Sequence, residues 1–192
     1  MFKILNCEIL KKKINIKNIK YLMMVEPISM RTVDESLFRW SCENEQFGLA
    51  KWLWEVSQRE TKKIDIHADN EYIFREACKY GRLEIVKWLW EVSCKSIDIH
   101  AGGEKAFSQA CRNGHLEVAR WLWEVSCKSI DIHIQNECIF RSVCREGHLE
   151  IAKWLWKISV DDSVGQINIY SVNADMFKFM PENVFEWLKS LE

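Results

Sequence analysis

The chain has 192 residues, with 27 Lys and Arg against 28 Asp and Glu, so its formal net charge is −1. This balance argues against non-specific nucleic-acid binding, which requires a large basic excess. Hydrophobic residues make up 48% of the chain, but no apolar run approaches the roughly 18 residues of a membrane span, so we expect a globular protein. No signal-peptide core is visible, and we therefore expect an intracellular location and mostly free thiols among the eight Cys.

Residues 1–27 are predicted to form a divergent N-terminal unit. Met1–Val25 holds six Lys and one Glu, and such a basic segment can also bind a membrane surface or act in targeting. However, Ile16–Met23 has the apolar spacing of a helix and resembles Leu83–Trp90 further along the chain. This similarity favours a capping repeat over a membrane or targeting segment.

A long internal repeat follows. Ile64-Asp65-Ile66-His67 recurs as Ile97-Asp98-Ile99-His100 and as Ile130-Asp131-Ile132-His133, with the same offset each time (97−64 and 130−97, both 33). The same body follows each copy: Phe74, Phe107 and Phe140; Cys78, Cys111 and Cys144; Gly81, Gly114 and Gly147; and three Trp-Leu-Trp motifs that begin at Trp88, Trp121 and Trp154. A fixed period of this length predicts a solenoid. Full repeats are expected at 28–63, 64–96, 97–129 and 130–166, with a divergent C-terminal unit at 167–192.

Each repeat is predicted to be a helix-turn-helix. In the unit 64–96, Ile64–Asn70 is first β-prone and then turn-prone, and Glu71–Tyr80 carries one apolar stripe. Gly81 is typical of a helix C-terminus. A second helix is expected over Leu83–Cys94, and it is apolar over so much of its circumference that neighbouring repeats must cover it.

From about residue 28 onward, these features resemble the ankyrin repeat. The resemblance rests on Gly114-His115-Leu116-Glu117-Val118 and its copy at 147–151, on the Asp-Ile-His segments and on the period. The Thr-Pro-Leu-His turn of the family is replaced by Tyr72-Ile73-Phe74-Arg75. The Lys-Trp-Leu-Trp helices are most similar to ankyrin-repeat proteins of giant DNA viruses of amoebae. The resemblance implies an all-α ankyrin-type solenoid with short hairpin loops, a protein–protein interaction function and, for a viral protein, the host cell cytoplasm.

The repeated Cys, His and Trp residues are interpreted as structural. Cys111 with His115, and Cys144 with His148, have a spacing that could suggest a metal site or a thiol–imidazole pair. Equivalent residues of successive repeats lie about 10 Å apart, too far to share an ion that needs ligands at about 2 Å. The Trp pairs are expected to pack between repeats, and the alternative is a partly exposed Trp ladder on the convex side.

The positions that vary between repeats are the candidates for binding. Ankyrin proteins bind through a concave surface lined by the first helices and the hairpin tips. The resemblance therefore assigns partner binding to the varied polar and aromatic residues there: Trp40, Tyr72, Arg75, Lys79, Arg112, Arg141 and Arg145. Their charge favours a protein partner of acidic character, and the alternative is a solvated charged helix face. We expect a monomer.

The C-terminus suggests a second function. Met180-Pro181-Glu182-Asn183 resembles the opening of an F-box, which would make residues 179–192 a truncated recruiting motif of a ubiquitin-ligase substrate adaptor. Pro at the first turn of a capping helix explains the same residues. No phosphate-binding Gly-rich loop, nucleophile elbow or metalloprotease helix is visible, so we expect no enzyme activity, cofactor or metal.

Overall fold

The structure is a computed structural model that describes residues 35–59, 63–127, 129–161, 165–168 and 180–191. The chain divides into two compact units, residues 1–68 and residues 69–192. The described residues form helices and no strands, which agrees with the expected all-α fold. The expected N-terminal unit at 1–27 and residues 169–179 of the expected C-terminal unit lie outside the described residues.

The described part of the first unit contains the helices α3 (Glu35–Glu43) and α4 (Phe47–Ser57). Phe38 and Cys42 are four residues apart on α3, so they lie on one helix face, and both are buried. The ring of Phe38 lies 6.4 Å from the ring of Trp54 on α4. The two helices therefore pack through the same Phe and second Trp that recur in the later repeats.

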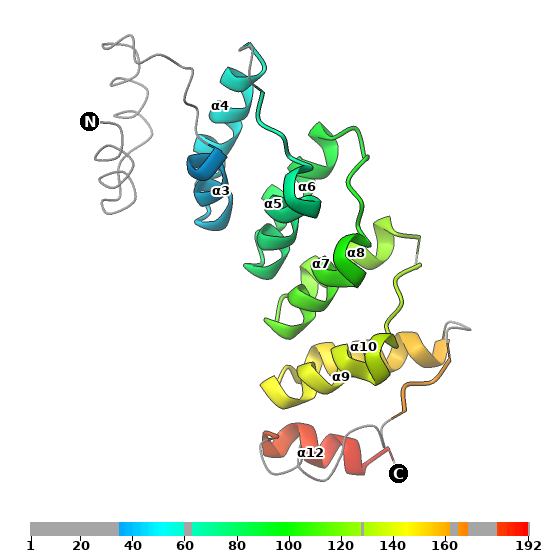
Figure 1. The fold of residues 1–192 in the computed structure, drawn as a ribbon. Helices are drawn as coiled ribbons and strands as arrows, with labels where there is room; N and C mark the ends of the chain where they lie inside the picture. The colour runs from blue at the N-terminus through cyan, green and yellow to red at the C-terminus, as the bar shows by residue number, and fades with distance from the viewer. Residues whose placement is uncertain (1–34, 60–62, 128, 162–164, 169–179, 192) are drawn as a thin grey trace. The chain divides into compact units, whose positions relative to one another are not determined.

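The second unit is built from three helix pairs and a final single helix. The helices are α5 (Ala68–Lys79), α6 (Leu83–Val92), α7 (Ala101–Arg112), α8 (Leu116–Val125), α9 (Ile134–Glu146), α10 (Leu149–Asp161) and α12 (Glu182–Lys189). The first helices α5, α7 and α9 form one layer, and the second helices α6, α8 and α10 form another (Figure 1). This two-layer stack is the arrangement expected for a helical solenoid.

The Ile-Asp-Ile segments form no strand in the described residues, although their sequence is β-prone. They keep the alternation of a strand, because Ile97 and Ile99 are buried while Asp98 is exposed. The backbone N–H of Asp98, however, donates to the Glu71 carboxylate over 3.2 Å. Asp98 in turn accepts a hydrogen bond from the His100 backbone N–H at 3.0 Å. The carboxylates of Glu71 and Asp98 thus accept backbone hydrogen bonds of the kind that a neighbouring strand accepts in a sheet.

The predicted turn before each first helix is present and is left-handed. Three consecutive residues have positive φ in each repeat of the second unit: 69–71, 102–104 and 135–137. The sequence pattern predicts this for Asp69-Asn70 and its copies, but places Glu71 already in the helix. Regular helix starts one residue later, because Glu71 has φ 59° and ψ 35°. The glutamate that ends each turn therefore points into the repeat interface instead of along the helix.

The same positions of each repeat form the hydrophobic core. Phe74, Phe107 and Phe140 are at most 1% exposed. In two of the Trp-Leu-Trp motifs, the first Trp packs on the Phe of the preceding repeat. The ring centroids lie 6.5 Å apart for Phe74–Trp121 and 6.0 Å apart for Phe107–Trp154. Trp123, the second Trp of its motif, instead contacts Phe107 of its own repeat. Trp90, a second Trp, packs on Trp121 of the following repeat with ring centroids 6.1 Å apart, so the expected packing between repeats involves both positions of the motif.

The Gly-His motifs also join successive repeats. Gly114 has φ 83°, a conformation that favours glycine, and a Cβ atom there would lie 2.8 Å from the His148 ring. His148 Nε2 donates to the carbonyl of Arg112 at the end of α7, over 3.0 Å. The ring of His115 covers Gly81 in the same way. Each of these histidines therefore packs on the glycine of the preceding repeat, close to the end of its first helix.

The last helix continues this register. Pro181 occupies the position that His148 has in the repeat before it, and its ring fills the space beside Gly147. Trp187 likewise occupies the position of Trp154, and its ring lies 6.4 Å from that of Phe140. α12 thus makes the contacts of a second helix in a terminal repeat. The residues that resemble an F-box opening are used here to cover the preceding repeat.

Candidate partner-binding surface

The five predicted cations lie on the first-helix layer of the second unit. Arg75 and Lys79 are on α5, Arg112 is on α7, and Arg141 and Arg145 are on α9. Arg112 and Arg145 are exposed, whereas the other three are half-buried. The structure separates them into two rows, one near the start of the helices and one at their ends.

The row near the start of the helices supports the turns. Arg75 donates to the carbonyl of Asp69 over 3.0 Å, and Arg141 donates to the carbonyl of Gln135 over 3.5 Å. The equivalent residue of the middle repeat is Ser108, and its turn contains Gly102 and Gly103, which adopt positive φ without strain. Arginine therefore stands where the left-handed turn lacks glycine. Stabilising these turns is therefore one role of Arg75 and Arg141.

The row at the helix ends is more available to a partner. It consists of Lys79, Arg112 and Arg145, one residue per repeat, which we call the cationic row. Lys79 forms an ion pair with Glu76 at 2.8 Å, and exposed Arg145 lies 3.2 Å from Glu146. In the middle repeat, Gln109 and Asn113 occupy the two places of these acidic residues. Within the described residues, no ion pair involves Arg112.

The two predicted aromatic candidates are both half-buried. Tyr72 is the first regular residue of α5 after its left-handed turn. Trp40 lies on α3 and belongs to the first unit. An aromatic residue that the sequence reasoning missed is Tyr80, which follows Lys79 and is 41% exposed. Its ring lies 4.8 Å from Nζ of Lys79, and tyrosine beside a cation is a common composition of binding hot spots.

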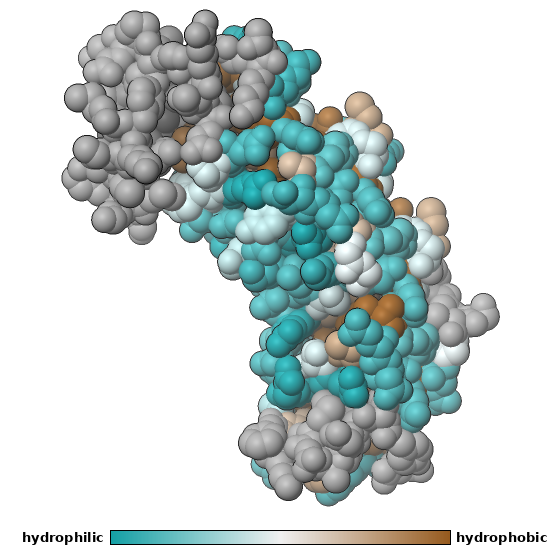
Figure 2. Space-filling model, viewed as in Figure 1, coloured by the Kyte–Doolittle hydropathy of each residue, from teal (hydrophilic) through white to brown (hydrophobic). Residues whose placement is uncertain are grey.

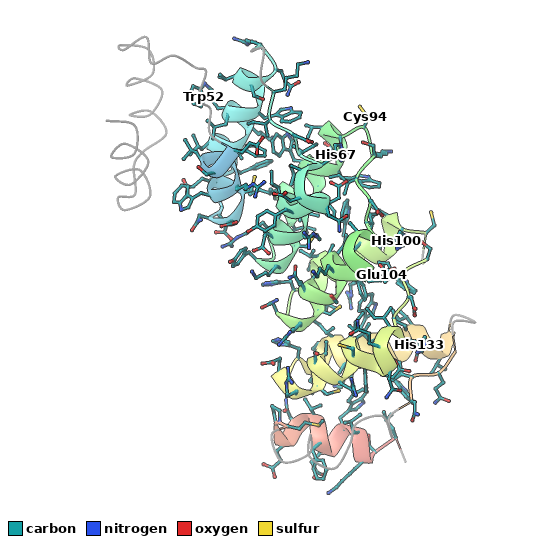
Figure 3. The ribbon with its side chains drawn as sticks, viewed as in Figure 1. Trp52, His67, Cys94, His100, Glu104 and His133 are labelled. Carbon is teal, nitrogen blue, oxygen red and sulfur yellow. The ribbon has the colours of Figure 1, made fainter. Side chains whose placement is uncertain are left out.

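The sequence reasoning also missed a series of buried glutamates. Glu71, Glu104 and Glu137 are only 6–7% exposed. Oε1 of Glu104 lies 2.7 Å from Nδ1 of His100 and 3.4 Å from the backbone nitrogen of Asp131 in the next repeat (Figure 3). Glu137 repeats this pattern with His133, at 2.8 Å. The recurrence of Glu directly after each turn, with the period of the repeat, was the available signal.

These carboxylates explain the repeated His residues. Nδ1 of His100 and Nδ1 of His133 each lie within hydrogen-bond distance of the glutamate four residues further along the chain. Each histidine thereby fixes a glutamate that accepts a backbone N–H of the following repeat. The expected structural role of His100 and His133 is supported by this geometry, and it involves joining repeats rather than binding a ligand.

The environment of His115 makes its charged form unfavourable. Burial lowers the pKa of this imidazole below its ordinary value of 6.5, and the charges of Arg82 and His148 lower it further. A hydrogen bond to the backbone of Lys79 raises the pKa; this effect is smaller than that of burial but larger than that of either charge. The folded chain therefore keeps His115 neutral at pH values where the unfolded chain begins to protonate it.

This shift predicts an acid-sensitive contribution to stability. Below pH 6.5 the unfolded state binds more protons at His115 than the folded state, so the free energy of unfolding should fall as the pH falls. Urea unfolding between pH 7.5 and 5 should show a smaller decrease for His115→Gln than for the native chain. NMR titration should also show a higher His115 pKa in Arg82→Gln. An unchanged pKa in that variant would contradict the assigned repulsion.

The described cysteines fall into three groups by exposure. Cys42, Cys78, Cys111 and Cys144 are buried, Cys138 is half-buried, and Cys94 and Cys127 are exposed. Figure 3 shows Cys94 in the segment after α6. Burial raises the pKa of Cys42 and of Cys144 to about 12. All seven described cysteines are free thiols. Because the thiolate is the reactive form, the buried group has the properties of structural rather than catalytic thiols.

Thiol labelling should separate these groups. In the folded chain, maleimide should modify Cys94 and Cys127 within minutes, whereas Cys78, Cys111 and Cys144 should react at least about tenfold more slowly. Unfolding in urea should remove the difference. Mass spectrometry of tryptic peptides measures the modification of each site. Rapid native labelling of Cys111 or Cys144 would contradict their structural role and favour an activated thiol.

The described residues contain no group of three or more Cys, His, Asp and Glu side chains that could hold a metal ion. His115 and His148, which the spacing paired with Cys111 and Cys144, instead cover the glycines of the preceding repeats. In the view of Figure 2, hydrophilic residues cover most of the described surface, and hydrophobic residues form small separate patches. The described part of this face therefore offers mainly polar groups to a partner.

Comparison with known proteins agrees with the repeat geometry. The family model described as "Ankyrin repeats (3 copies)" matches residues 38–136, just over half of the chain. The chain belongs to the ankyrin-repeat family. Ankyrin repeats are generally protein–protein interaction modules. No curated protein matches the chain. In the described part of this ankyrin-repeat chain, no helix has the length and apolarity that crossing a membrane requires.

Proposed function

We propose that this chain recognises a partner protein through the first-helix and turn surface of residues 69–146. The observation that supports the proposal most strongly is the distribution of charge between the two helix layers. Apart from the three buried glutamates, α5, α7 and α9 carry six Lys and Arg against three Asp and Glu. The second helices α6, α8 and α10 carry four Lys and Arg against six Asp and Glu. The first-helix layer thus favours an acidic partner although the whole chain is nearly neutral.

The buried glutamates do not cancel this charge at the helix ends. Each stands eight residues before a member of the cationic row, a distance of about 12 Å along a helix. Their carboxylates accept hydrogen bonds from histidines and backbone amides. The competing explanation is that Lys79, Arg112 and Arg145 only stabilise the C-terminal ends of their helices, an effect of about 0.3–1 kcal/mol each.

Affinity capture with a matched pair of variants tests the proposal. The site variant replaces Lys79, Arg112 and Arg145 with Glu. The control variant replaces Lys87, Arg120 and Lys153 with Glu; these three residues occupy the same position of the repeat on α6, α8 and α10. Proteins recovered from a cell lysate are identified by mass spectrometry. A partner retained by the native chain and the control but lost by the site variant supports the proposal. Equal recovery by all three, with unchanged melting temperatures, would contradict it.

The ligase-adaptor alternative receives no comparable support. Pro181 and Trp187 already cover Gly147 and Phe140, as residues of a terminal repeat would. The sequence resemblance to ankyrin proteins of giant amoebal viruses supports a host cytoplasmic location for the recognition function. A fluorescently tagged chain expressed in amoebae should then distribute through the cytoplasm. Accumulation in the nucleus or on an organelle would count against this location.

A further inference from the structure

We infer that the partner offers an extended acidic segment with a carboxylate at about every third residue, docked along Lys79, Arg112 and Arg145. The inference rests on the proposed function and adds the chemistry and spacing of the bound segment. It starts from the register of the cationic row, whose members occupy the same position in successive repeats and each lie in the last turn of a first helix.

The repeat spacing determines the spacing of the carboxylates. The first helices α7 and α9 pack directly, so equivalent side chains of these two helices, such as Arg112 and Arg145, lie about 8–10 Å apart. In a polyproline-type extended chain, every third residue lies on the same face at a rise of about 9 Å. In a β-strand the third residue points to the opposite face, so the same spacing cannot be matched there.

The surface chemistry favours an extended segment over a bound helix. An amphipathic helix docks by burying an apolar face in a hydrophobic groove. Among the large hydrophobic residues of the described chain, only Tyr80 and Val160 are exposed, and Val160 lies on the other helix layer. A row of cations with one exposed tyrosine at its end offers ionic contacts and no such groove. About seven extended residues suffice to reach all three cations.

Arg112 should dominate the interaction. Lys79 and Arg145 each have an acidic neighbour of their own repeat that competes with a ligand carboxylate, at 2.8 Å and 3.2 Å. Gln109 and Asn113 leave Arg112 without such a competitor at the equivalent positions. Arginine also binds a carboxylate in a bidentate manner, which fixes the register of the segment.

Peptide binding tests the inference directly. A fluorescein-labelled, Pro- and Ala-rich nonapeptide with Glu at positions 2, 5 and 8 is compared with the same peptide carrying Gln, and with one carrying three consecutive Glu. Fluorescence anisotropy measures the dissociation constant for the full native chain. We expect the every-third peptide to bind at least about tenfold more tightly than the Gln peptide, and more weakly in high salt.

Matched charge reversals locate the contact. Arg112→Glu should weaken the every-third peptide about tenfold or more, whereas Arg120→Glu, an exposed arginine on α8, should leave it unchanged. Equal binding of the Gln peptide, equal or tighter binding of the consecutive-Glu peptide, or equal loss in both variants would overturn the inference. If capture of a protein still depends on the cationic row while the peptide fails, the proposed function stands and only the acidic extended segment is rejected.

Discussion

Phe107→Ala should lower the free energy of unfolding by about 3–5 kcal/mol, because it removes a fully buried aromatic ring that two repeats share. Phe107 is 0% exposed, and its ring lies 6.4 Å from that of Trp123 and 6.0 Å from that of Trp154. One substitution therefore opens a cavity both within its own repeat and at the interface with the next. In a solenoid, where each repeat is stabilised mainly by its neighbours, such a loss should spread along the second unit.

Urea unfolding followed by tryptophan fluorescence measures the effect, and hydrogen exchange of α7, α8 and α10 shows where it acts. The matched control is Phe185→Ala, since Phe185 is half-buried on α12 and carries Lys189 over its ring at 4.1 Å. The control should cost no more than about 1 kcal/mol. Comparable losses in the two variants would show that the Phe–Trp contacts between repeats do not stabilise the unit as the geometry indicates.

The core was predictable because the repeat copies each buried position several times. The recurring spacing of Phe, Cys, Gly and Trp identifies the inward-facing residues and the glycine at each helix end. Gly81 and Gly147 have the positive φ expected of helix C-termini. These predictions succeed because burial and turn conformation are local consequences of residue type and period.

The contacts between repeats were harder to predict. Glu104 stands at the start of a helix, where a glutamate is ordinarily exposed and interacts with the helix dipole. Its burial depends on the left-handed turn and on His100 and Asp131, which only the three-dimensional register brings together. Periodicity shows that such a residue recurs, but it does not show which groups of the next repeat it contacts.

The candidate site was predicted at the level of the helix layer but not at the level of single residues. All five cations lie on first helices, as the sequence pattern indicates. Their division into two rows depends on the backbone carbonyls of Asp69 and Gln135, which accept hydrogen bonds from Arg75 and Arg141. The exposure of Tyr80 likewise depends on where α5 ends, and helix ends are the least predictable part of a sequence reading.

Glu104→Ala should lower the free energy of unfolding by about 2–4 kcal/mol, because it leaves two donors without their acceptor. The backbone N–H of Asp131 and Nδ1 of His100 both approach Oε1 of Glu104. Glu104→Gln keeps an oxygen at this position and should cost about half as much, since only the charge of the acceptor is lost. Urea unfolding of the three chains at pH 7.5 gives the comparison.

Two further variants separate the contribution of the Glu104 carboxylate to stability from that of the backbone conformation at this residue. Glu104 has φ 57°, a conformation in which glycine is unstrained, so relief of strain alone would make Glu104→Gly more stable than the native chain. We expect Glu104→Gly to be destabilised instead, because the loss of the acceptor exceeds the roughly 1 kcal/mol of strain. Glu117→Ala, on the exposed face of α8, should change stability by less than about 0.5 kcal/mol. If Glu104→Gly were instead more stable than the native chain by about the relieved strain, the buried carboxylates would not join the repeats, and their regular spacing would reflect the turn alone.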